Sequence, residues 1–212
     1  MATAKRTYGD RCGIARALDV VGERWALLVV RELLLGPKRF TDLRAGLPKL
    51  GPDILSQRLR DLEETGLVRR GKLPPPAASR IYELTDRGQE LEPVILALGR
   101  WGSGEPFPEG DAELGPDAAV LALKTMFDPA RATGLDATYE LRFGELPYRL
   151  RVTGGELHAV RGSAEAPDAT IAADPGTLAQ VLWRGLPMSE LSVTGSRQAA
   201  KRFLKLFAAP AV

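Results

Sequence analysis

The polar residues best suited to binding chemistry lie close together, between residues 51 and 70. Ser56, Gln57 and Arg60 fall on or beside one face of the segment when it is wound as a helix. Hydroxyl, amide and guanidinium groups can hydrogen-bond to the edges of bases, and arginine bound to guanine is the commonest strong pairing. These residue types at this spacing predict a helix that enters the major groove of DNA.

The helix that must carry these groups is predicted from its apolar residues. Leu55, Leu59 and Leu62 recur at steps of three and four residues, which places them on one buried face. Pro52 suits the first helical position, because an N–H there has no helical partner to lose. Gly66 is expected to end the helix.

Further contacts are expected on DNA phosphates. Lys38, Arg39 and Thr41 precede and begin a shorter predicted helix over residues 40–47, whose N-terminal dipole favours an anion. Arg58 lies on the flank of the longer helix, where it can reach a phosphate.

Two of these cations have an alternative role. Arg58 and Arg60 can instead form ion pairs with Asp61 and Glu64 on a solvated helix face. Both interpretations stay open, because the sequence does not distinguish a solvated cation from one that binds DNA.

Two strand-like segments follow, at residues 67–73 and 79–84. The intervening Pro74-Pro75-Pro76-Ala77-Ala78 is too rich in proline for a tight hairpin, so a projecting loop is predicted. A basic two-stranded ribbon after a helix-turn-helix is a wing, which contacts the DNA backbone or the minor groove. The wing cations expected to bind phosphate are Arg69, Lys72 and Arg80. A strand that merely faces solvent is an equally good account of Arg69 and Arg70.

Apolar periodicity also predicts the helices around this motif. A short helix spans residues 14–20, and a nearly all-apolar, buried helix spans residues 23–35. Thr85 caps a last helix over residues 86–99, which Pro93 bends or interrupts. The residues of that helix expected to face the core are Leu91, Val94, Ile95 and Leu98.

The order of these motifs resembles the HxlR-type winged helix-turn-helix regulators of the MarR-like superfamily. The matching pieces are Cys12-Gly13-Ile14, Gly22-Glu23-Arg24-Trp25, Gly36-Pro37-Lys38-Arg39-Phe40-Thr41-Asp42-Leu43, Leu55-Ser56-Gln57-Arg58-Leu59-Arg60-Asp61-Leu62-Glu63, Gly66-Leu67-Val68, Tyr82-Glu83-Leu84-Thr85 and Trp101-Gly102. The resemblance covers residues 10–104. It implies a homodimer, formed largely through the terminal helices, that binds an inverted-repeat operator in double-stranded DNA. The proline-rich loop and the long C-terminal half depart from a minimal member of the family and leave its ligand open.

Composition excludes several other classes of protein. The 212 residues are 44% hydrophobic and 26% charged, which is typical of a globular chain with two domains. No apolar run reaches the roughly 18–20 residues that span a bilayer, and no secretory signal is expected. A single cysteine, Cys12, and a single histidine, His158, exclude a disulfide framework and a zinc site of the usual kind. We expect a cytoplasmic protein without metal, cofactor or membrane contact.

The net charge of +2 is unevenly divided along the chain. Residues 1–104 hold 18 Lys and Arg against 13 Asp and Glu, a net of +5. The remaining residues hold 11 against 14, a net of −3. Only the first half is therefore expected to meet a polyanion.

Cys12 has two interpretations. Its neighbours include Arg11 and Arg16, and nearby cations lower the pKa of a thiol. Some members of the resembled family sense oxidants or electrophiles with a cysteine at this place, so a redox switch is one interpretation. The other interpretation is a small residue packed near the dimer interface.

The composition changes at residues 102–116, which are rich in glycine, proline and acidic residues and predict a linker. The predicted domains are residues 1–103, for DNA binding and dimerisation, and residues 117–212, with a linker at 104–116. In the second domain, helices are predicted at residues 117–126, 174–184 and 196–207, and strands at 137–143, 148–153, 156–161, 168–173 and 191–194. This order predicts an α+β fold, an antiparallel meander with helices covering one face.

Residues 168–178, 182–186 and 191–203 resemble parts of a sterol carrier protein type-two-like domain. The resemblance implies a cavity between sheet and helices that holds an apolar small-molecule effector. The residues expected to line it are Leu178, Val181, Leu182, Trp183, Leu186, Met188 and Phe203. Each of them can equally fill a closed core, and His158 is expected to be an ordinary strand residue.

The predicted function is a sequence-specific DNA-binding transcriptional regulator whose second domain binds an effector. A lipid or small-molecule carrier with an accessory helical domain is the alternative, although a carrier has no need of a basic wing. Catalytic residues are not expected. The sequence lacks a glycine-rich phosphate loop, a His-bearing metal motif and a Gly-x-Ser-x-Gly nucleophile elbow, so an enzyme is disfavoured.

Overall fold

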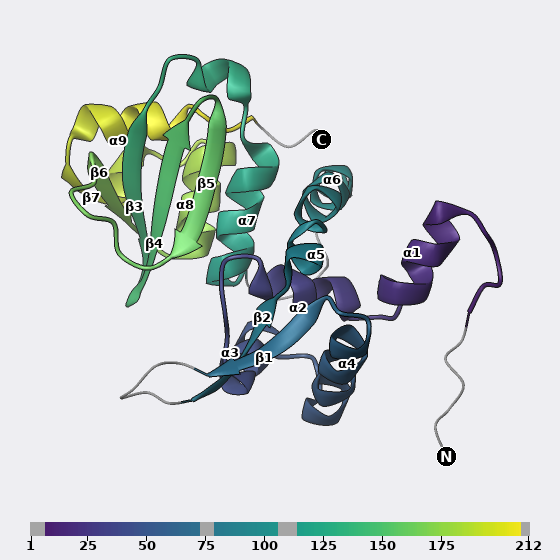
Figure 1. The fold of residues 1–212 in the computed structure, drawn as a ribbon. Helices are drawn as coiled ribbons and strands as arrows, with labels where there is room; N and C mark the ends of the chain where they lie inside the picture. Colours follow the sequence, from purple (N-terminus) through teal and green to yellow (C-terminus); the bar gives the residue numbers. More distant parts are fainter. Residues whose placement is uncertain (1–6, 73–78, 106–113, 209–212) are drawn as a thin grey trace. The chain divides into compact units, whose positions relative to one another are not determined.

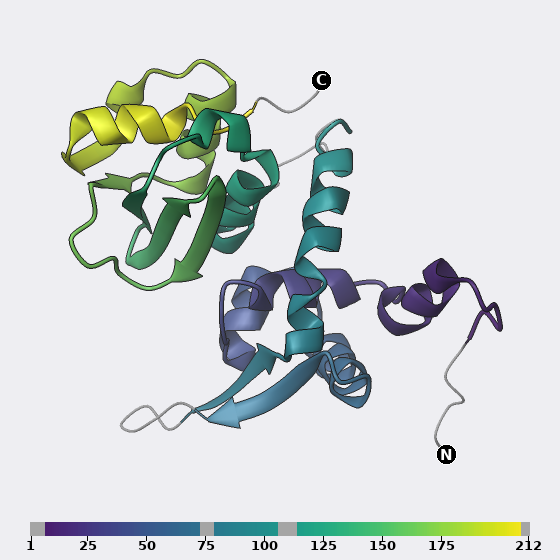
Figure 2. The same cartoon turned by 45° about the horizontal axis from the view of Figure 1, so that its top comes forward.

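The computed structural model describes residues 7–72, 79–105 and 114–208. The chain forms two compact units, Met1–Ile95 and Leu96–Val212, each with its own core (Figures 1 and 2). The predicted proline loop at residues 74–78 and most of the predicted linker lie outside the described residues. Within those residues, no helix is long and apolar enough to cross a membrane.

The first unit consists of helices and one two-stranded ribbon. Its helices are α1 (Gly13–Val21), α2 (Ala26–Leu33), α3 (Phe40–Gly46), α4 (Pro52–Glu64) and α5 (Asp86–Gln89), and α6 (Glu92–Gly102) continues into the second unit. The ribbon is formed by β1 (Val68–Lys72) and β2 (Arg80–Leu84), which pair antiparallel. This order of helix, turn, helix and ribbon is the predicted winged helix-turn-helix.

Helix α4 packs as its apolar spacing predicts. Leu55, Leu59 and Leu62 are at most 1% exposed and lie in the core beside α2. Burial of each leucine contributes roughly 1.5–3 kcal/mol, so this face holds the helix in place. Pro52 occupies the first helical position, as predicted.

The end of α4 also follows from the sequence. Gly66 has a φ of +70°, a left-handed conformation that only glycine adopts at low cost. The N–H of Gly66 donates to the carbonyl of Glu63 at 3.0 Å, and the N–H of Leu67 donates to that of Leu62 at 2.9 Å. This turn leads directly from α4 into β1.

Helix α2 is buried as predicted but begins later. Val29 and Val30 are 0% exposed. The predicted start at Glu23 is wrong, because Trp25 has a φ of +80° and regular helical geometry begins only at Ala26.

The predicted last helix of this unit is in fact two helices. Thr85 caps α5 by accepting a backbone N–H at 3.2 Å, and the chain leaves helical geometry just before Pro93. Both the cap and the interruption are confirmed. The prediction that Val94 and Leu98 face the core is wrong: they are 53% and 49% exposed, because the Ile95 side of α6 turns inward instead.

The second unit combines helices with one sheet, in agreement with the predicted α+β class. Its helices are α7 (Pro116–Met126), α8 (Pro175–Trp183) and α9 (Arg197–Leu204), with 3-10 turns η1 (Pro129–Ala132) and η2 (Met188–Glu190). Its strands are β3 (Ala137–Phe143), β4 (Leu146–Thr153), β5 (Glu156–Arg161), β6 (Ala169–Ala172) and β7 (Ser192–Gly195). They form a five-stranded sheet in the order β5-β4-β3-β6-β7.

The sheet differs from the predicted antiparallel meander at one pair. Strands β3 and β6 run parallel, with Tyr139 opposite Ala169, whereas the other neighbours are antiparallel. The connection after β5 crosses to the far side of β3, and a parallel pair requires such a crossover. The tight turn at Gly154-Gly155 is confirmed, since both residues have positive φ.

Helices cover one face of this sheet (Figures 1 and 2). Tyr139 of β3 packs on Phe203 of α9, with ring centroids 4.8 Å apart. On the same face, the Tyr148 hydroxyl of β4 donates to Asp117 of α7 at 2.7 Å. The opposite face is largely exposed, so the strands alternate between a buried and a solvated side.

The solvated face nevertheless contains one buried acid, Glu140. Its carboxylate accepts hydrogen bonds from the Arg142 guanidinium at 2.6 Å and from the Ala164 N–H at 2.7 Å. Ala164 belongs to the connection between β5 and β6, so Glu140 fastens that connection to the sheet. Burial raises the pKa of the Glu140 carboxyl, but the hydrogen bonds and the nearby guanidinium together lower it below the ordinary 4.5.

Substituting Glu140→Gln tests this fastening. A carboxyl whose pKa is lower in the folded chain stabilises the fold above its unfolded pKa, and this stabilisation is lost as pH falls through the folded pKa. We expect the variant to be less stable by about 1–3 kcal/mol at neutral pH. The difference from wild type should shrink as pH falls below about 4.5.

Urea unfolding followed by circular dichroism at several pH values measures this difference. Glu145→Gln, the same change at an exposed carboxylate in the β3–β4 turn, is the matched control and should change little. A constant difference at every pH contradicts the role of the Glu140 charge.

Candidate nucleic-acid interface

The exposed face of α4 brings together the predicted base-reading residues. Gln57 and Arg60 are exposed, and Ser56 is half-buried at the edge. The Arg60 guanidinium donates to Gln57 Oε1 at 2.6 Å, and Gln57 Nε2 donates to Asp61 Oδ1 at 2.7 Å. In the part of the chain that is described, Arg60 forms no ion pair with Asp61 or Glu64. The amide and the guanidinium are therefore held side by side, with N–H groups to spare.

Ile54 belongs to the same surface and was not among the predicted residues. It is 51% exposed in the first turn of α4, one turn before Gln57. An apolar side chain at such a place is suited to the methyl group of thymine. Its position on the helix, between the leucine stripe and the polar face, is the sequence signal that identifies it.

Arg58 lies away from this exposed face. Its side chain is 14% exposed and pairs with Asp61 at 3.0 Å and with Glu23 at 3.3 Å. The ion pair with Asp61, one of the two interpretations of the sequence, is the one that forms. Arg58 ties α4 to the segment before α2, and we leave it out of the proposed interface.

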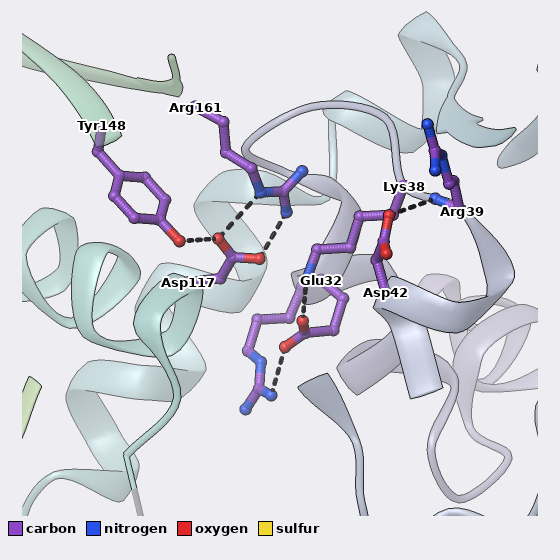
Figure 3. A network of polar contacts seen from close by, with 8 residues as sticks. Glu32, Lys38, Arg39, Asp42, Asp117, Tyr148 and Arg161 are labelled. Carbon is purple, nitrogen blue, oxygen red and sulfur yellow. Dashed lines mark hydrogen bonds and ion pairs between the residues drawn. The ribbon is translucent and has the colours of Figure 1, made fainter. Parts of the chain in front are cut away.

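Lys38 is part of the interior. It is 9% exposed, and its ammonium contacts the carboxylate of Glu32, which also accepts the Arg31 guanidinium at 2.7 Å (Figure 3). The backbone of Lys38 exchanges two hydrogen bonds with Tyr82 of β2, at 3.0 and 2.8 Å. Lys38 thus connects the α2–α3 turn to the wing. A buried ammonium held by a carboxylate is poorly placed to bind phosphate, so Lys38 does not belong to the proposed DNA interface.

Arg39 and Thr41 are exposed at the start of α3, as predicted. Asp42 accepts the backbone N–H of Arg39 at 3.1 Å (Figure 3) and the Thr41 hydroxyl at 3.3 Å. The Asp42 carboxylate therefore occupies the position at which the helix dipole favours an anion. A phosphate contact here depends on the Arg39 guanidinium more than on the dipole.

The wing carries its predicted cations on exposed positions. Arg69 pairs with Glu83 across the ribbon at 2.9 Å. Lys72 and Arg80 lie directly opposite each other at the described end of the ribbon. Like charges in opposite positions repel, and an anion placed between them relieves this repulsion.

Arg70, on the same strand, has a different role. Its guanidinium pairs with Glu63 of α4 at 2.8 Å and lies over the Tyr82 ring, 5.9 Å from the centroid. Hydrogen bonding to the Glu63 carboxylate raises the pKa of Arg70. Arg70 therefore joins the wing to α4.

The residues predicted to line a cavity in the second unit differ in burial. Leu178 and Phe203 are at most 1% exposed and belong to the closed core. The others are half-buried, namely Val181, Leu182, Trp183, Leu186 and Met188. A depression of about 470 Å³ lies elsewhere, between the η1 segment and the β4–β5 turn.

Two buried tyrosines of this unit contrast in their hydrogen bonding. Tyr148 bonds to Asp117, which also binds the Arg161 guanidinium at 2.5 Å (Figure 3). The Tyr139 hydroxyl is buried and has no hydrogen-bond partner among the residues that the structure describes. Burial raises the pKa of both hydroxyls. Tyr139 therefore places one unsatisfied polar group in an apolar core.

Cys12 is exposed immediately before α1. Its backbone N–H donates to Asp10 Oδ1 at 2.9 Å. Within residues 7–72, 79–105 and 114–208, no three His, Cys, Asp or Glu side chains are grouped as metal ligands.

The chain is similar to known proteins over its N-terminal half. The family model described as HxlR-like helix-turn-helix matches residues 20–107. The uncharacterised HTH-type transcriptional regulator YvaP of Bacillus subtilis is 38% identical over 88 residues, which are 42% of this chain and 82% of YvaP. The uncharacterised HTH-type regulator sll1512 of Synechocystis is 38% identical over 97 residues, 45% of this chain and 70% of sll1512.

Among solved structures, the reduced form of the transcriptional regulator YodB from B. subtilis is 33% identical. The match covers 48% of this chain and 100% of that chain, with a TM-score of 0.40. With the winged helix-turn-helix described above, the family model and the relatives YvaP and sll1512 give the family. The chain belongs to the HxlR-like helix-turn-helix family and is a DNA-binding transcriptional regulator.

Proposed function

We propose that α4 is the recognition helix and lies in the major groove of an operator. The observation that carries this proposal is its exposed face, where Gln57 and Arg60 are bonded side by side with Ile54 next to them. Arg60 suits the O6 and N7 atoms of guanine, Gln57 suits adenine, and Ile54 suits the thymine methyl. Ser56 adds a hydroxyl at the edge of the same surface.

Phosphate contacts set the position of α4 in the groove. Lys72 and Arg80 approach the backbone from the wing, where a phosphate relieves their mutual repulsion. Arg69 exchanges its exposed ion pair for a phosphate at little cost. Arg39 and Thr41 approach the backbone from the start of α3.

We also infer a homodimer. Helix α1 buries only Val21, which leaves Ile14 and Leu18 at 73% and 43% exposed. The exposed apolar side chains of α6 are Val94, Leu98 and Trp101. Exposed apolar patches on both terminal helices indicate a protein–protein interface, and a second copy of the chain can bury them through a two-fold interface. Two recognition helices related by that axis read an inverted repeat.

We propose that the second domain, residues 117–212, responds to an apolar small molecule, as its sterol-carrier-like sequence implies. The DNA-binding domain then spans residues 1–103, with the linker at 104–116. The unpaired Tyr139 hydroxyl supports this role, because it can bond to the polar end of such a ligand. The effector changes DNA binding only if it binds the competent and incompetent states unequally.

Oxidation of Cys12 is a second proposed signal. The thiol is exposed at the start of α1, one of the two helices assigned to the dimer. A carrier function for the whole chain is the alternative, but it leaves the polar face of α4 without a purpose. We propose no enzymatic activity and no membrane contact, and we place the protein in the cytoplasm.

The two arginines of α4 give a matched test of the DNA interface. Arg60→Ala should weaken binding to an operator selected from random duplexes by about 1–3 kcal/mol, with the melting temperature within about 2 °C of wild type. Arg58→Ala should destabilise the fold by about 1–2 kcal/mol, because the ion pairs of its guanidinium with Asp61 and Glu23 are lost. Fluorescence anisotropy and thermal melts separate the two effects. If the Arg60 variant has a lower melting temperature than wild type but each folded molecule binds the operator with wild-type affinity, the role of Arg60 is structural.

The homodimer is tested by placing a charge on α6. Leu98→Glu should convert the dimer to a monomer in sedimentation experiments, because an interfacial carboxylate loses its water. Val160→Glu changes another exposed apolar residue, 40% exposed on β5 against 49% for Leu98, and should leave the dimer intact. If the Leu98→Glu variant dimerises as tightly as wild type, the exposed face of α6 is not the dimer interface.

The Tyr139 hydroxyl is tested against that of Tyr148. Tyr148→Phe should lower stability by about 1–3 kcal/mol because Asp117 loses a buried bond, whereas Tyr139→Phe should leave the ligand-free protein as stable or more so. Binding of a fluorescent sterol analogue should be weakened by Tyr139→Phe. Tight binding that the substitution leaves unchanged excludes Tyr139 from the ligand site.

A further inference from the structure

Helix α9 presents a row of cations to solvent. Arg197, Lys201 and Arg202, together with Lys205 at the C-cap of α9, are exposed and lie within an arc of about 140° on a helix of 3.6 residues per turn. The row extends about 12 Å along the axis. The other side of α9 is apolar and packs on the sheet, with Phe203 fully buried.

These four cations contrast with others of the same unit. Four arginines elsewhere in the unit each bind a carboxylate at 2.5–3.0 Å, namely Arg131, Arg142, Arg151 and Arg161. None of the four cations of α9 forms an ion pair or side-chain hydrogen bond with another described residue. Residues 117–212 hold 11 Lys and Arg against 10 Asp and Glu, so the row does not reflect a large general excess of cations in this domain.

Helix stability does not account for the row. Cations near the end of a helix complement its dipole, but Arg197 occupies the first helical position, where positive charge is unfavourable. Arg197, Lys201 and Lys205 are also successive neighbours at four-residue spacing, and each like-charge pair destabilises a helix by about 0.2–0.5 kcal/mol. The arrangement becomes favourable only beside an external anion.

We propose that the cationic row of α9 binds phosphates of the same duplex that α4 reads, in the DNA next to the operator. Duplex DNA carries one charge per about 1.7 Å of axis, so a row of this length meets several phosphates. DNA is also the polyanion that this chain already binds. The inference rests on the proposed role of α4 for the location of the duplex.

The segment that connects α6 to α7 makes weak contacts effective, because it links the predicted DNA-binding domain to the domain that contains α9. Between Gly102 and Pro116 the chain has 13 residues, which span at most about 45 Å. Once α4 holds the operator, the row is confined near flanking DNA, and this local concentration compensates for low intrinsic affinity. The contact is independent of base sequence, because it involves phosphates alone.

The test measures the salt dependence of DNA binding by the full-length chain. Lys201→Gln/Lys205→Gln removes two charges from α9, and Arg149→Gln/Arg151→Gln removes two from the solvated face of the sheet as a matched control. Each protein is titrated against the selected operator alone and against the operator extended by about 15 base pairs on each side, roughly the reach of the segment between α6 and α7. Arg197→Gln serves as an independent second variant, and thermal melts verify that each variant folds.

On the extended duplex, the α9 variant should lose up to about 2 from the slope of log Kobs against log salt concentration. On the short duplex it should match wild type, and the sheet variant should match wild type on both. An unchanged slope for the α9 variant on the extended duplex overturns the proposal. Equal losses in both variants overturn it too, because they report net charge alone.

A second experiment tests whether the phosphates bound by the row belong to lipid headgroups instead of DNA. Wild type and the α9 variant are both tested for binding to vesicles of phosphatidylcholine and phosphatidylserine. If only wild type binds the vesicles and the DNA slope of the variant is unchanged, the row belongs to a membrane surface and the proposal is overturned. Failure of wild type to bind either duplex contradicts the role of α4. Binding without any contribution from α9 contradicts only the inference made here.

Discussion

Burial of leucines on one side of α4, and on that side alone, is the constraint on which the DNA-binding unit depends. With Leu55, Leu59 and Leu62 packed in the core, the opposite face has to meet solvent or a ligand. Gln57 and Arg60 are then presented without any specialised scaffold. The left-handed turn at Gly66 sends the chain straight into the wing, and the Arg70–Glu63 ion pair joins the same two elements. Burial of these leucines therefore orients the exposed face of α4, and the turn that ends α4 places the wing beside it.

Periodicity predicts this unit well because its signals are local. The helix of Pro52, the turn at Gly66 and the cap at Thr85 each depend on residues within one or two turns. What periodicity does not report is which charges find partners. Arg58 and Arg60 are the same residue type two positions apart. The Arg58 side chain is 14% exposed and pairs with Asp61, whereas Arg60 is exposed and donates to Gln57. Lys38 similarly depends on Glu32, six residues away and buried in another helix.

Longer-range features were harder to predict. The strands of the second unit were located to within one or two residues, but the parallel pairing of β3 with β6 depends on how the chain crosses the sheet. The spacing of Val94 and Leu98 predicts burial, yet both are exposed, because apolar spacing identifies a face suited to packing and does not say what packs on it. The net charge of a segment has a similar limit. The net negative charge of the second half does not reveal that one of its helices, α9, has a polar face that is entirely basic or neutral.

Helix α1 has a consequence for the behaviour of the molecule in solution. It contains nine residues and buries a single side chain, Val21, and helices this short are marginal in water when isolated. In the homodimer proposed above, its order is linked to the covering of Ile14 and Leu18 by the second copy, so that folding of this segment and association form one equilibrium. Under that proposal, helicity of α1 rises with protein concentration. The abundance of the regulator, and not only its signal, then sets the fraction of molecules with an ordered first helix.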